Sequence, residues 1–172
     1  AELVSPTCFG GTDGSVALEV QGGTAPLVYV YNGDSLDNVI LSMVGGGDFA
    51  IEVVDGNGCI FDASLTLEEP ADITIDASVT DVLCNGDETG AIVVSATGGS
   101  GMGYAYNIND AGFGPGNEAS GLAAGSYPIE VQDDNECSNA TTVTIESPEA
   151  IEVTVDANDG ATGTEADGVI DI

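Results

Sequence analysis

One stretch of eleven residues occurs twice in the chain, and this internal repeat constrains the fold more than any other feature. Phe49–Cys59 and Tyr127–Cys137 share an aromatic residue, Ile-Glu-Val, Asp, Asn and Cys at one offset of 78 residues (127 − 49 = 78; 137 − 59 = 78). Each copy alternates like a strand with one buried face and then enters an Asp/Asn/Gly turn. A repeated strand, turn and cysteine indicates a repeated architectural unit rather than a catalytic centre.

Other segments recur at nearly the same spacing. They are Ala1–Cys8 with Ala77–Cys84, Ser15–Val20 with Ala91–Ala96, Gly22-Gly23 with Gly98-Gly99, and Ser64–Leu67 with Thr141–Ile145. The paired glycines predict a turn that needs positive φ or close backbone approach, and Pro70 and Pro148 each close a unit. We therefore expect repeat 1 at residues 1–76, repeat 2 at 77–156 and the truncated start of a third repeat at 157–172.

The sequence predicts an all-β fold of tandem immunoglobulin-like β-sandwich repeats. Short alternating segments with frequent turn signals are typical of such sandwiches, and no helical periodicity is sustained. A Tyr-x-Tyr-Asn match aligns Tyr29 with Tyr104 and Tyr31 with Tyr106. Because residues two apart share a strand face, we expect these tyrosines to be core or half-buried residues.

All charged side chains are negative. The 172 residues include 30 Asp plus Glu and no Lys, Arg or His. Such a chain repels phosphate backbones and anionic membrane surfaces, so we expect no nucleic-acid partner and no membrane insertion. Two interpretations stay open: a surface that resists association in saline, and a dependence on divalent cations.

Four cysteines lie at matching places in the two repeats. Of the three possible pairings, Cys8–Cys59 with Cys84–Cys137 is the one that keeps each bond within its repeat, and we predict it. Each closed loop of about fifty residues would contribute on the order of 4 kcal/mol. Disulfides imply an oxidising compartment. With no signal peptide and no long apolar run, we expect a mature, soluble segment of a secreted or cell-surface protein.

Catalysis is not expected. Without His, Lys or Arg the chain has no imidazole base, ammonium or guanidinium group, and a cysteine nucleophile would lack an activating neighbour. We expect no cofactor, although Ca²⁺ stays a weak alternative because hard oxygen ligands lie in the turns. The weak candidate ligands are Asp13, Asp55, Asn57, Asp133 and Asn135. The same residue types are also common in tight turns that bind no metal.

The order of the residues that recur in both units resembles that of the SprB repeat, which occurs in tandem on large surface adhesins of gliding Bacteroidota. The first copy matches at Cys8, Asp13-Gly14, Gly22-Gly23, Pro26, Tyr29, Gly47, Phe49, Asp55–Cys59 and Pro70. The second matches at Cys84, Gly90, Gly98-Gly99, Tyr104, Gly121-Leu122, Gly125, Tyr127, Asp133, Asn135, Cys137 and Pro148. It departs at Met102, where the family has Pro, and at Glu136, where the family has Gly.

The resemblance implies an immunoglobulin-like sandwich, export by the type IX secretion route, and a surface role in adhesion, gliding motility or filament building. We therefore expect a structural segment of a secreted, cell-surface repeat protein that gives reach, stiffness and attachment. Its expected partners are neighbouring repeats of the same protein in a homo-oligomeric filament or fibre. The alternative is a calcium- or glycan-binding module of a surface protein.

Overall fold

The computed structural model describes residues 1–36, 40–99, 102–154, 156–157 and 170–171, and the regular structure in these ranges is all β. The strands are β1 (Glu2–Val4), β2 (Gly14–Ala17), β3 (Val28–Tyr31), β4 (Asp34–Leu36), β5 (Ile40–Val44), β6 (Gly47–Val54), β7 (Ile60–Leu67), β8 (Ala71–Thr80), β9 (Gly90–Gly99), β10 (Ala105–Ile108), β11 (Glu118–Leu122), β12 (Gly125–Gln132), β13 (Ser138–Ile145), β14 (Asp156–Ala157) and β15 (Ile170–Asp171). The predicted fold class is confirmed.

The strands form two sandwiches. Unit 1 packs the antiparallel sheet β1-β2-β5 on the sheet β4-β3-β6-β7, and unit 2 packs β11-β9-β8 on β10-β12-β13. The predicted alternation holds in the repeated strand, because β6 and β12 have the same succession of buried and exposed residues. Each unit has its own apolar core, centred on Phe49 and Ile51 in unit 1 and on Ile129 and Val131 in unit 2.

Strand registers show that the units are copies of one design. Gly47 pairs with Leu67 in unit 1 and Gly125 pairs with Ile145 in unit 2, both displaced by 78 residues (47 + 78 = 125; 67 + 78 = 145). The tyrosine alignment predicted from the sequence is wrong by two residues. Tyr29 pairs with Val53 and Tyr106 pairs with Val131 (53 + 78 = 131), so Tyr106 rather than Tyr104 is the counterpart of Tyr29.

The tyrosines are half-buried, as expected. Tyr29, Tyr31, Tyr104 and Tyr106 all have intermediate exposure. Tyr31 stacks on Phe49 with ring centroids 5.7 Å apart, and the Tyr104 hydroxyl donates to the Gly98 carbonyl oxygen at 2.6 Å. Such rings bury their apolar bodies while the polar tip finds a partner.

The expected boundary between residues 76 and 77 falls inside β8, which pairs with β9 from Ala71 to Thr80. Apolar Ile73 and Ile75 alternate with exposed residues along this half of the strand, so it belongs to the sandwich of unit 2. The boundary expected between 156 and 157 likewise falls inside β14. Its pairing with β15, Ala157 opposite Ile170, has the register of Val79 opposite Ile92 displaced by 78 residues (79 + 78 = 157; 92 + 78 = 170).

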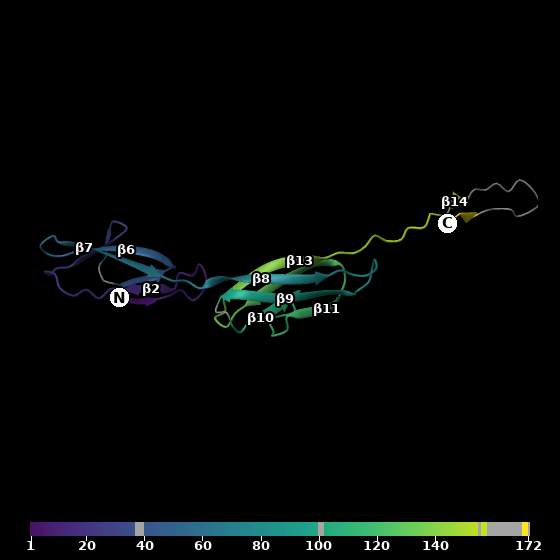
Figure 1. Cartoon of the computed structure of the whole chain (residues 1–172), viewed down its shortest axis with the longest axis horizontal. Helices are drawn as coiled ribbons and strands as arrows, with labels where there is room; N and C mark the ends of the chain where they lie inside the picture. The colour runs from purple at the N-terminus through teal and green to yellow at the C-terminus, as the bar shows by residue number, and fades with distance from the viewer. Residues whose placement is uncertain (37–39, 100–101, 155, 158–169, 172) are drawn as a thin grey trace, which may run out of the picture.

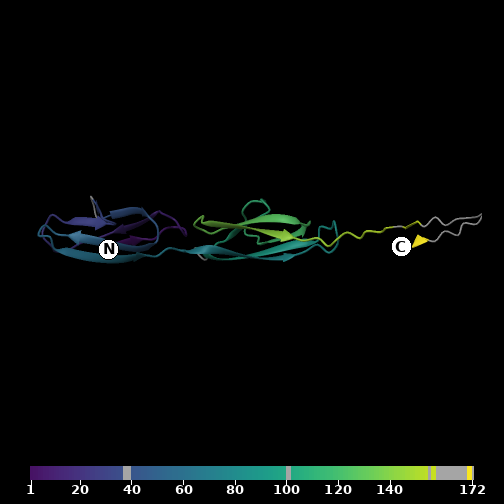
Figure 2. The same ribbon diagram turned by 90° about the horizontal axis from the view of Figure 1, so that it is seen from above.

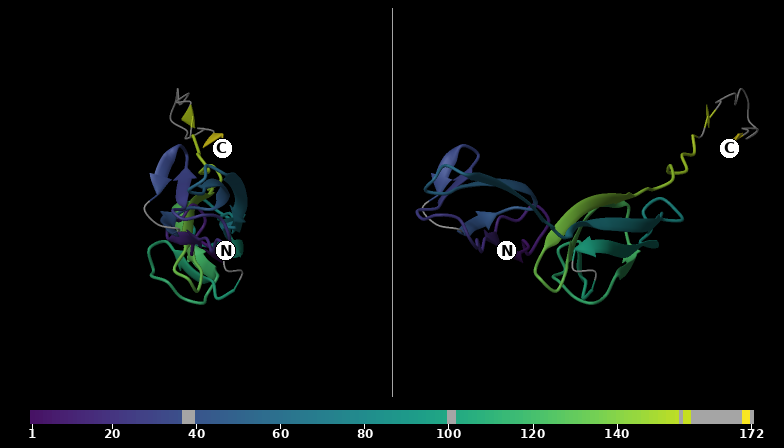
Figure 3. Two further views of the ribbon diagram at one scale, coloured as in Figure 1. Left: turned by 90° about the vertical axis from the view of Figure 1, so that its left-hand side faces the viewer. Right: turned by 60° about the vertical axis from the view of Figure 1, so that its left-hand side comes forward.

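The two sandwiches lie end to end along the long axis of the molecule (Figures 1 and 2). The right-hand view in Figure 3 shows them as separate bodies that meet at a narrow junction. After β13 the chain leaves unit 2 as an extended segment that continues away from both sandwiches (Figure 1).

Candidate functional site

The two ends of each sandwich carry different turns. Gly14 at the start of β2 pairs with Val44, and β6 begins three residues later at Gly47, so the Cys8 turn lies at the end of unit 1 where β6 starts. The turn that carries Cys59 follows the other end of β6. We call these the early-cysteine end and the late-cysteine end. An eight-residue strand spans roughly 26 Å, which separates the two turns.

The disulfide pairing predicted from the sequence is wrong. Cys8 bonds to Cys137, with their Cα atoms 5.5 Å apart, whereas Cys59 and Cys84 are exposed free thiols. The physical reason is the length of β6 and β12. A disulfide requires Cα atoms within about 7 Å, and the strand holds the early and late cysteines of one unit at opposite ends. The bond therefore joins the early-cysteine end of unit 1 to the late-cysteine end of unit 2.

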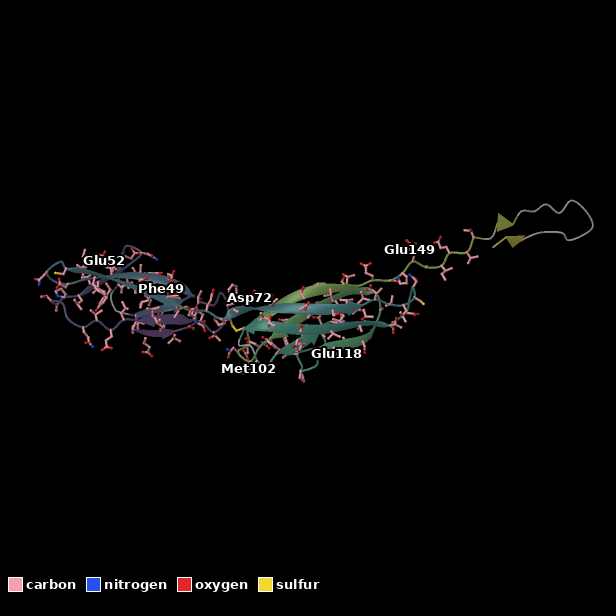
Figure 4. The ribbon with its side chains drawn as sticks, viewed as in Figure 1. Phe49, Glu52, Asp72, Met102, Glu118 and Glu149 are labelled. Carbon is pink, nitrogen blue, oxygen red and sulfur yellow. A yellow bond between two sulfur atoms is a disulfide. The ribbon has the colours of Figure 1, made fainter. Side chains whose placement is uncertain are left out.

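The junction between the sandwiches is made by the disulfide, a short linker and local contacts. Glu68–Pro70 connect β7 to β8, and the Glu69 carboxylate accepts a hydrogen bond from the Gly10 N–H at 3.1 Å. Asp72 lies at this junction (Figure 4). Cys137 is buried in the core of unit 2, and Cys8 packs against the same core, so the bond is part of the folded interior.

The Asp-x-Asn-x-Cys motif builds a turn around one carboxylate. In unit 1, Asp55 Oδ1 accepts from the N–H groups of Asn57 and Cys59, each at 2.9 Å, and Oδ2 accepts from the Thr24 N–H at 3.1 Å. These backbone hydrogen bonds, that of Cys59 first, lower the pKa of Asp55. In unit 2, Asp133 Oδ1 accepts the corresponding hydrogen bonds from the N–H groups of Asn135 at 2.9 Å and Cys137 at 3.0 Å.

Asp13 has a comparable structural role at the early-cysteine end. Its carboxylate accepts from the hydroxyl group and the backbone N–H of Thr7. The hydroxyl contact and then the N–H contact lower the pKa of Asp13. Sequence reasoning missed Thr7 and Thr24 as partners, because a lone threonine in a turn has no distinctive spacing.

The candidate metal ligands are not brought together. Asp13 lies at the early-cysteine end of unit 1, Asp55 and Asn57 lie at its late-cysteine end, and Asp133 and Asn135 lie in unit 2. Within the described ranges, no three acidic or cysteine side chains are grouped so that they could hold an ion.

Glu136 occupies the position where unit 1 has Gly58. Its φ is +65° and that of Gly58 is +79°. Both residues donate their N–H to the carbonyl oxygen of the turn aspartate, Glu136 to Asp133 at 3.0 Å and Gly58 to Asp55 at 2.8 Å. The turn geometry is therefore kept although a side chain replaces glycine, at the steric cost of a left-handed conformation.

Each free cysteine adjoins a hollow. Cys59 lines a cavity of about 350 Å³ together with Leu18, Val20 and Phe61. Cys84 lines a groove of about 400 Å³ with Leu83 and Pro148, among others. These two hollows lie at the two outer ends of the pair of sandwiches, whereas the bonded cysteines lie at its centre.

The known protein family that matches this chain is defined by the same repeated unit. The model of the SprB repeat matches residues 1–35 and 77–113, the opening part of each unit. The chain contains SprB-type repeats. Proteins with this repeat are typically surface proteins. None of the curated proteins compared with the chain is significantly similar to it.

Two solved structures have a distant likeness to this chain. Fibronectin(III)-like modules of CbhA from Clostridium thermocellum align with a TM-score of 0.37 and 12% identity, over 84% of this chain and 90% of that chain. The ectodomain of mouse nectin-like molecule 4, with domains Ig1–Ig3, aligns with a TM-score of 0.35 and 14% identity, over 88% of this chain and 65% of that one. Among the described residues, no helix is long and apolar enough to span a membrane.

Proposed function

We propose that the chain is a structural, non-enzymatic segment of a secreted, cell-surface repeat protein, an adhesin or extracellular filament. Its SprB-type units would provide reach and stiffness for attachment or motility. Export by the type IX route and gliding motility belong to this proposal and come from the family resemblance.

The observation that carries the proposal is the double connection between consecutive units. The linker Glu68–Pro70 and the Cys8–Cys137 bond both cross one junction. A single flexible connection lets two bodies swing, but two connections at separate points remove most of that freedom. Units joined in this way add length without adding a hinge, which is what a load-bearing array needs.

The charge and the disulfide support an extracellular setting. A stable disulfide is favoured outside reducing compartments. Side chains carry a formal charge of −30, and at the ionic strength of saline their repulsion is screened beyond about 8–10 Å. The acidic surface would thus keep neighbouring fibres apart without destabilising each unit greatly.

Small-angle X-ray scattering of the oxidised chain tests the structural role. We expect a rod-like particle whose maximum dimension matches two sandwiches end to end plus the extended segment. Cys8→Ser should keep both sandwiches folded but broaden the distribution of interatomic distances, because one connection is lost. A compact particle with a globular distance distribution would contradict the proposal.

We infer further that the fold requires no calcium. The support is that both Asp55 carboxylate oxygens already accept backbone N–H groups, so binding an ion there would cost those contacts. Thermal unfolding should give the same midpoint with millimolar Ca²⁺ and with excess chelator. A rise of several degrees with Ca²⁺, absent with Na⁺ at equal ionic strength, would favour a calcium-binding module instead.

A further inference from the structure

The chain contains three Asn-Gly dipeptides, a sequence that is prone to spontaneous loss of the side-chain amide. They are Asn32-Gly33, Asn57-Gly58 and Asn85-Gly86. In this reaction the backbone nitrogen of the following residue attacks the asparagine side chain, and glycine hinders the attack least because it has no Cβ. In a folded protein the rate therefore depends on how firmly the structure holds that nitrogen and that side chain.

The turn that carries Cys59 holds both reacting groups of Asn57-Gly58. The Gly58 N–H donates to the Asp55 carbonyl oxygen at 2.8 Å, and Asn57 Nδ2 donates to Thr24 Oγ1 at 2.9 Å. The backbone N–H of Asn57 also donates to Asp55 Oδ1 at 2.9 Å. The attacking nitrogen and the amide that it would attack are thus fixed by separate partners, and the turn has to open before they can meet.

The Asn85-Gly86 dipeptide is held through its side chain. Asn85 Nδ2 donates to Ser147 Oγ at 3.2 Å and to the Pro148 carbonyl oxygen at 3.1 Å. Within the described residues, no backbone carbonyl oxygen accepts the Gly86 N–H. Attack here requires the loss of the side-chain contacts but not of a backbone hydrogen bond, so we expect weaker protection than at Asn57.

Asn32-Gly33 forms the whole connection between β3 and β4, whose ends Tyr31 and Asp34 lie directly opposite each other. The φ angles of Asn32 and Gly33 are +54° and +87°, a left-handed pair typical of a tight two-residue hairpin turn. Both residues are exposed, and within the described part of the chain no group is hydrogen-bonded to the Gly33 N–H or the Asn32 amide. Because β4 is a short strand at the edge of its sheet, little structure has to yield for this turn to open.

We propose that Asn32 is a site of spontaneous covalent modification, where the side-chain amide is lost through a cyclic succinimide and the residue becomes aspartate or isoaspartate. The hairpin leaves the attacking nitrogen and the side-chain amide exposed and free of hydrogen bonds, whereas the other two dipeptides are held by neighbouring groups. The modification needs water and no enzyme. This inference does not depend on the proposed structural role.

The reaction balances with water as the co-reactant. Hydroxide removes the proton of the Gly33 N–H, the nitrogen forms a bond to Asn32 Cγ, and Nδ2 leaves as ammonia. Water then opens the succinimide ring. Cleavage of the new bond between nitrogen and Cγ gives aspartate, whereas cleavage of the bond between nitrogen and the main-chain carbonyl carbon gives isoaspartate. No atom is oxidised or reduced in either route.

The two products differ in their effect on the hairpin. Both add a negative charge beside a hollow of about 340 Å³ that Glu52 and Asp62 also line. These two carboxylate residues already lie directly opposite each other on β6 and β7, and like charges in such positions weaken strand pairing. Isoaspartate in addition inserts an extra carbon atom into the main chain of a two-residue turn, so Tyr31 and Asp34 lose their register. We therefore expect isoaspartate to release β4 from β3.

Incubation of the whole oxidised chain at mildly alkaline pH tests the proposal. Cleavage after Asp and Glu places the three dipeptides in the peptides Val20–Asp34, Gly56–Asp62 and Val82–Asp87, and mass spectrometry measures how fast each amide becomes an acid. We expect Asn32 to convert at least about tenfold faster than Asn57, because each hydrogen bond that must break lowers the reactive population several-fold. The rate at Asn85 should lie between these two.

The same incubation in guanidinium chloride is the control for sequence effects, and there the three rates should become similar. A folded chain in which Asn57 or Asn85 converts as fast as Asn32 would overturn the proposal, as would a folded chain in which Asn32 is stable. Rates that differ as much in the denatured chain as in the folded one would also overturn it, because local sequence and not the hairpin would then set the order.

Two variants test the structural explanation. Thr24→Val removes the hydroxyl group that accepts from the Asn57 amide, so it should raise the rate at Asn57 and leave that at Asn32 unchanged; an unchanged rate at Asn57 would refute the protection. Asn32→Asp adds the charge of the product without the extra carbon atom. Hydrogen exchange of the β4 amides should stay slow in this variant and become fast in the isoaspartate form isolated from the incubated chain. Equal exchange in both would overturn the release of β4.

Discussion

Hydrogen bonds from backbone N–H groups to single carboxylates take the place of ion pairs in this fold. With no basic side chain in the sequence, Asp55 and Asp133 are satisfied by backbone N–H groups of the turns they organise. A carboxylate that accepts two or three N–H groups is well compensated without a counter-ion. The acidic composition is therefore compatible with ordered turns because the backbone supplies the donors.

Asp133→Ala should destabilise unit 2 by about 1–3 kcal/mol, since it leaves the N–H groups of Asn135 and Cys137 without their acceptor in a buried setting. Asp134→Ala is the matched control, because Asp134 is exposed and surface substitutions usually change stability by less than about 0.5 kcal/mol. Urea unfolding of each variant gives the free energies. Equal losses for the two variants would refute the turn role of Asp133.

The lowered pKa of Asp55 predicts a pH dependence. Because the folded pKa lies below the usual value of 3.8, the stabilisation is fully present above that value and is lost as pH falls through the folded pKa. Wild type should therefore be more stable than Asp55→Ala at pH 7, and the gap in melting temperature should close below about pH 4. A gap that stays constant down to pH 2 would contradict this. Protonation of the other carboxylates affects wild type and Asp55→Ala alike, so it cancels in the difference between their melting temperatures.

At the scale of strands, the repeat made the fold largely predictable. The alternation in Phe49–Val54 and its copy predicts buried strand faces that β6 and β12 have. The tyrosine register was not predictable, because matching Tyr-x-Tyr letters ignores the pairing with β6 that sets the alignment. The disulfide was missed for a related reason. Spacing along the chain does not say at which end of a strand a turn emerges, and β6 and β12 separate the cysteines of one unit.

The first half of β8 belongs to the sandwich of unit 2, and Ile73 anchors it in the core of that unit. Ile73→Ala should lower the stability of unit 2 by about 2–5 kcal/mol, because it removes a buried side chain and leaves a cavity. Thr74→Ala changes an exposed neighbour on the same strand and should cost far less. Hydrogen exchange of the β9 amides reports the loss locally. Similar protection of β9 in both variants would contradict the anchoring role.

At the scale of the whole molecule, two small cores are held in line by one linker and one disulfide. Each unit buries its own apolar cluster, whereas the bond between Cys8 and Cys137 spans 129 residues of sequence. The disulfide therefore links the two units and does not close a loop within either of them. The proposed stiffness and reach depend on this assignment.

Peptide mapping of the oxidised chain without reduction tests the assignment most directly. Cleavage after Asp and Glu places the four cysteines in four different peptides, Leu3–Asp13, Gly56–Asp62, Val82–Asp87 and Cys137–Glu146. For the monomer we expect the first and last of these to be joined and the other two to carry free thiols. Joined Leu3–Asp13 and Gly56–Asp62, together with joined Val82–Asp87 and Cys137–Glu146, would mean that each unit is closed on itself and would contradict the account.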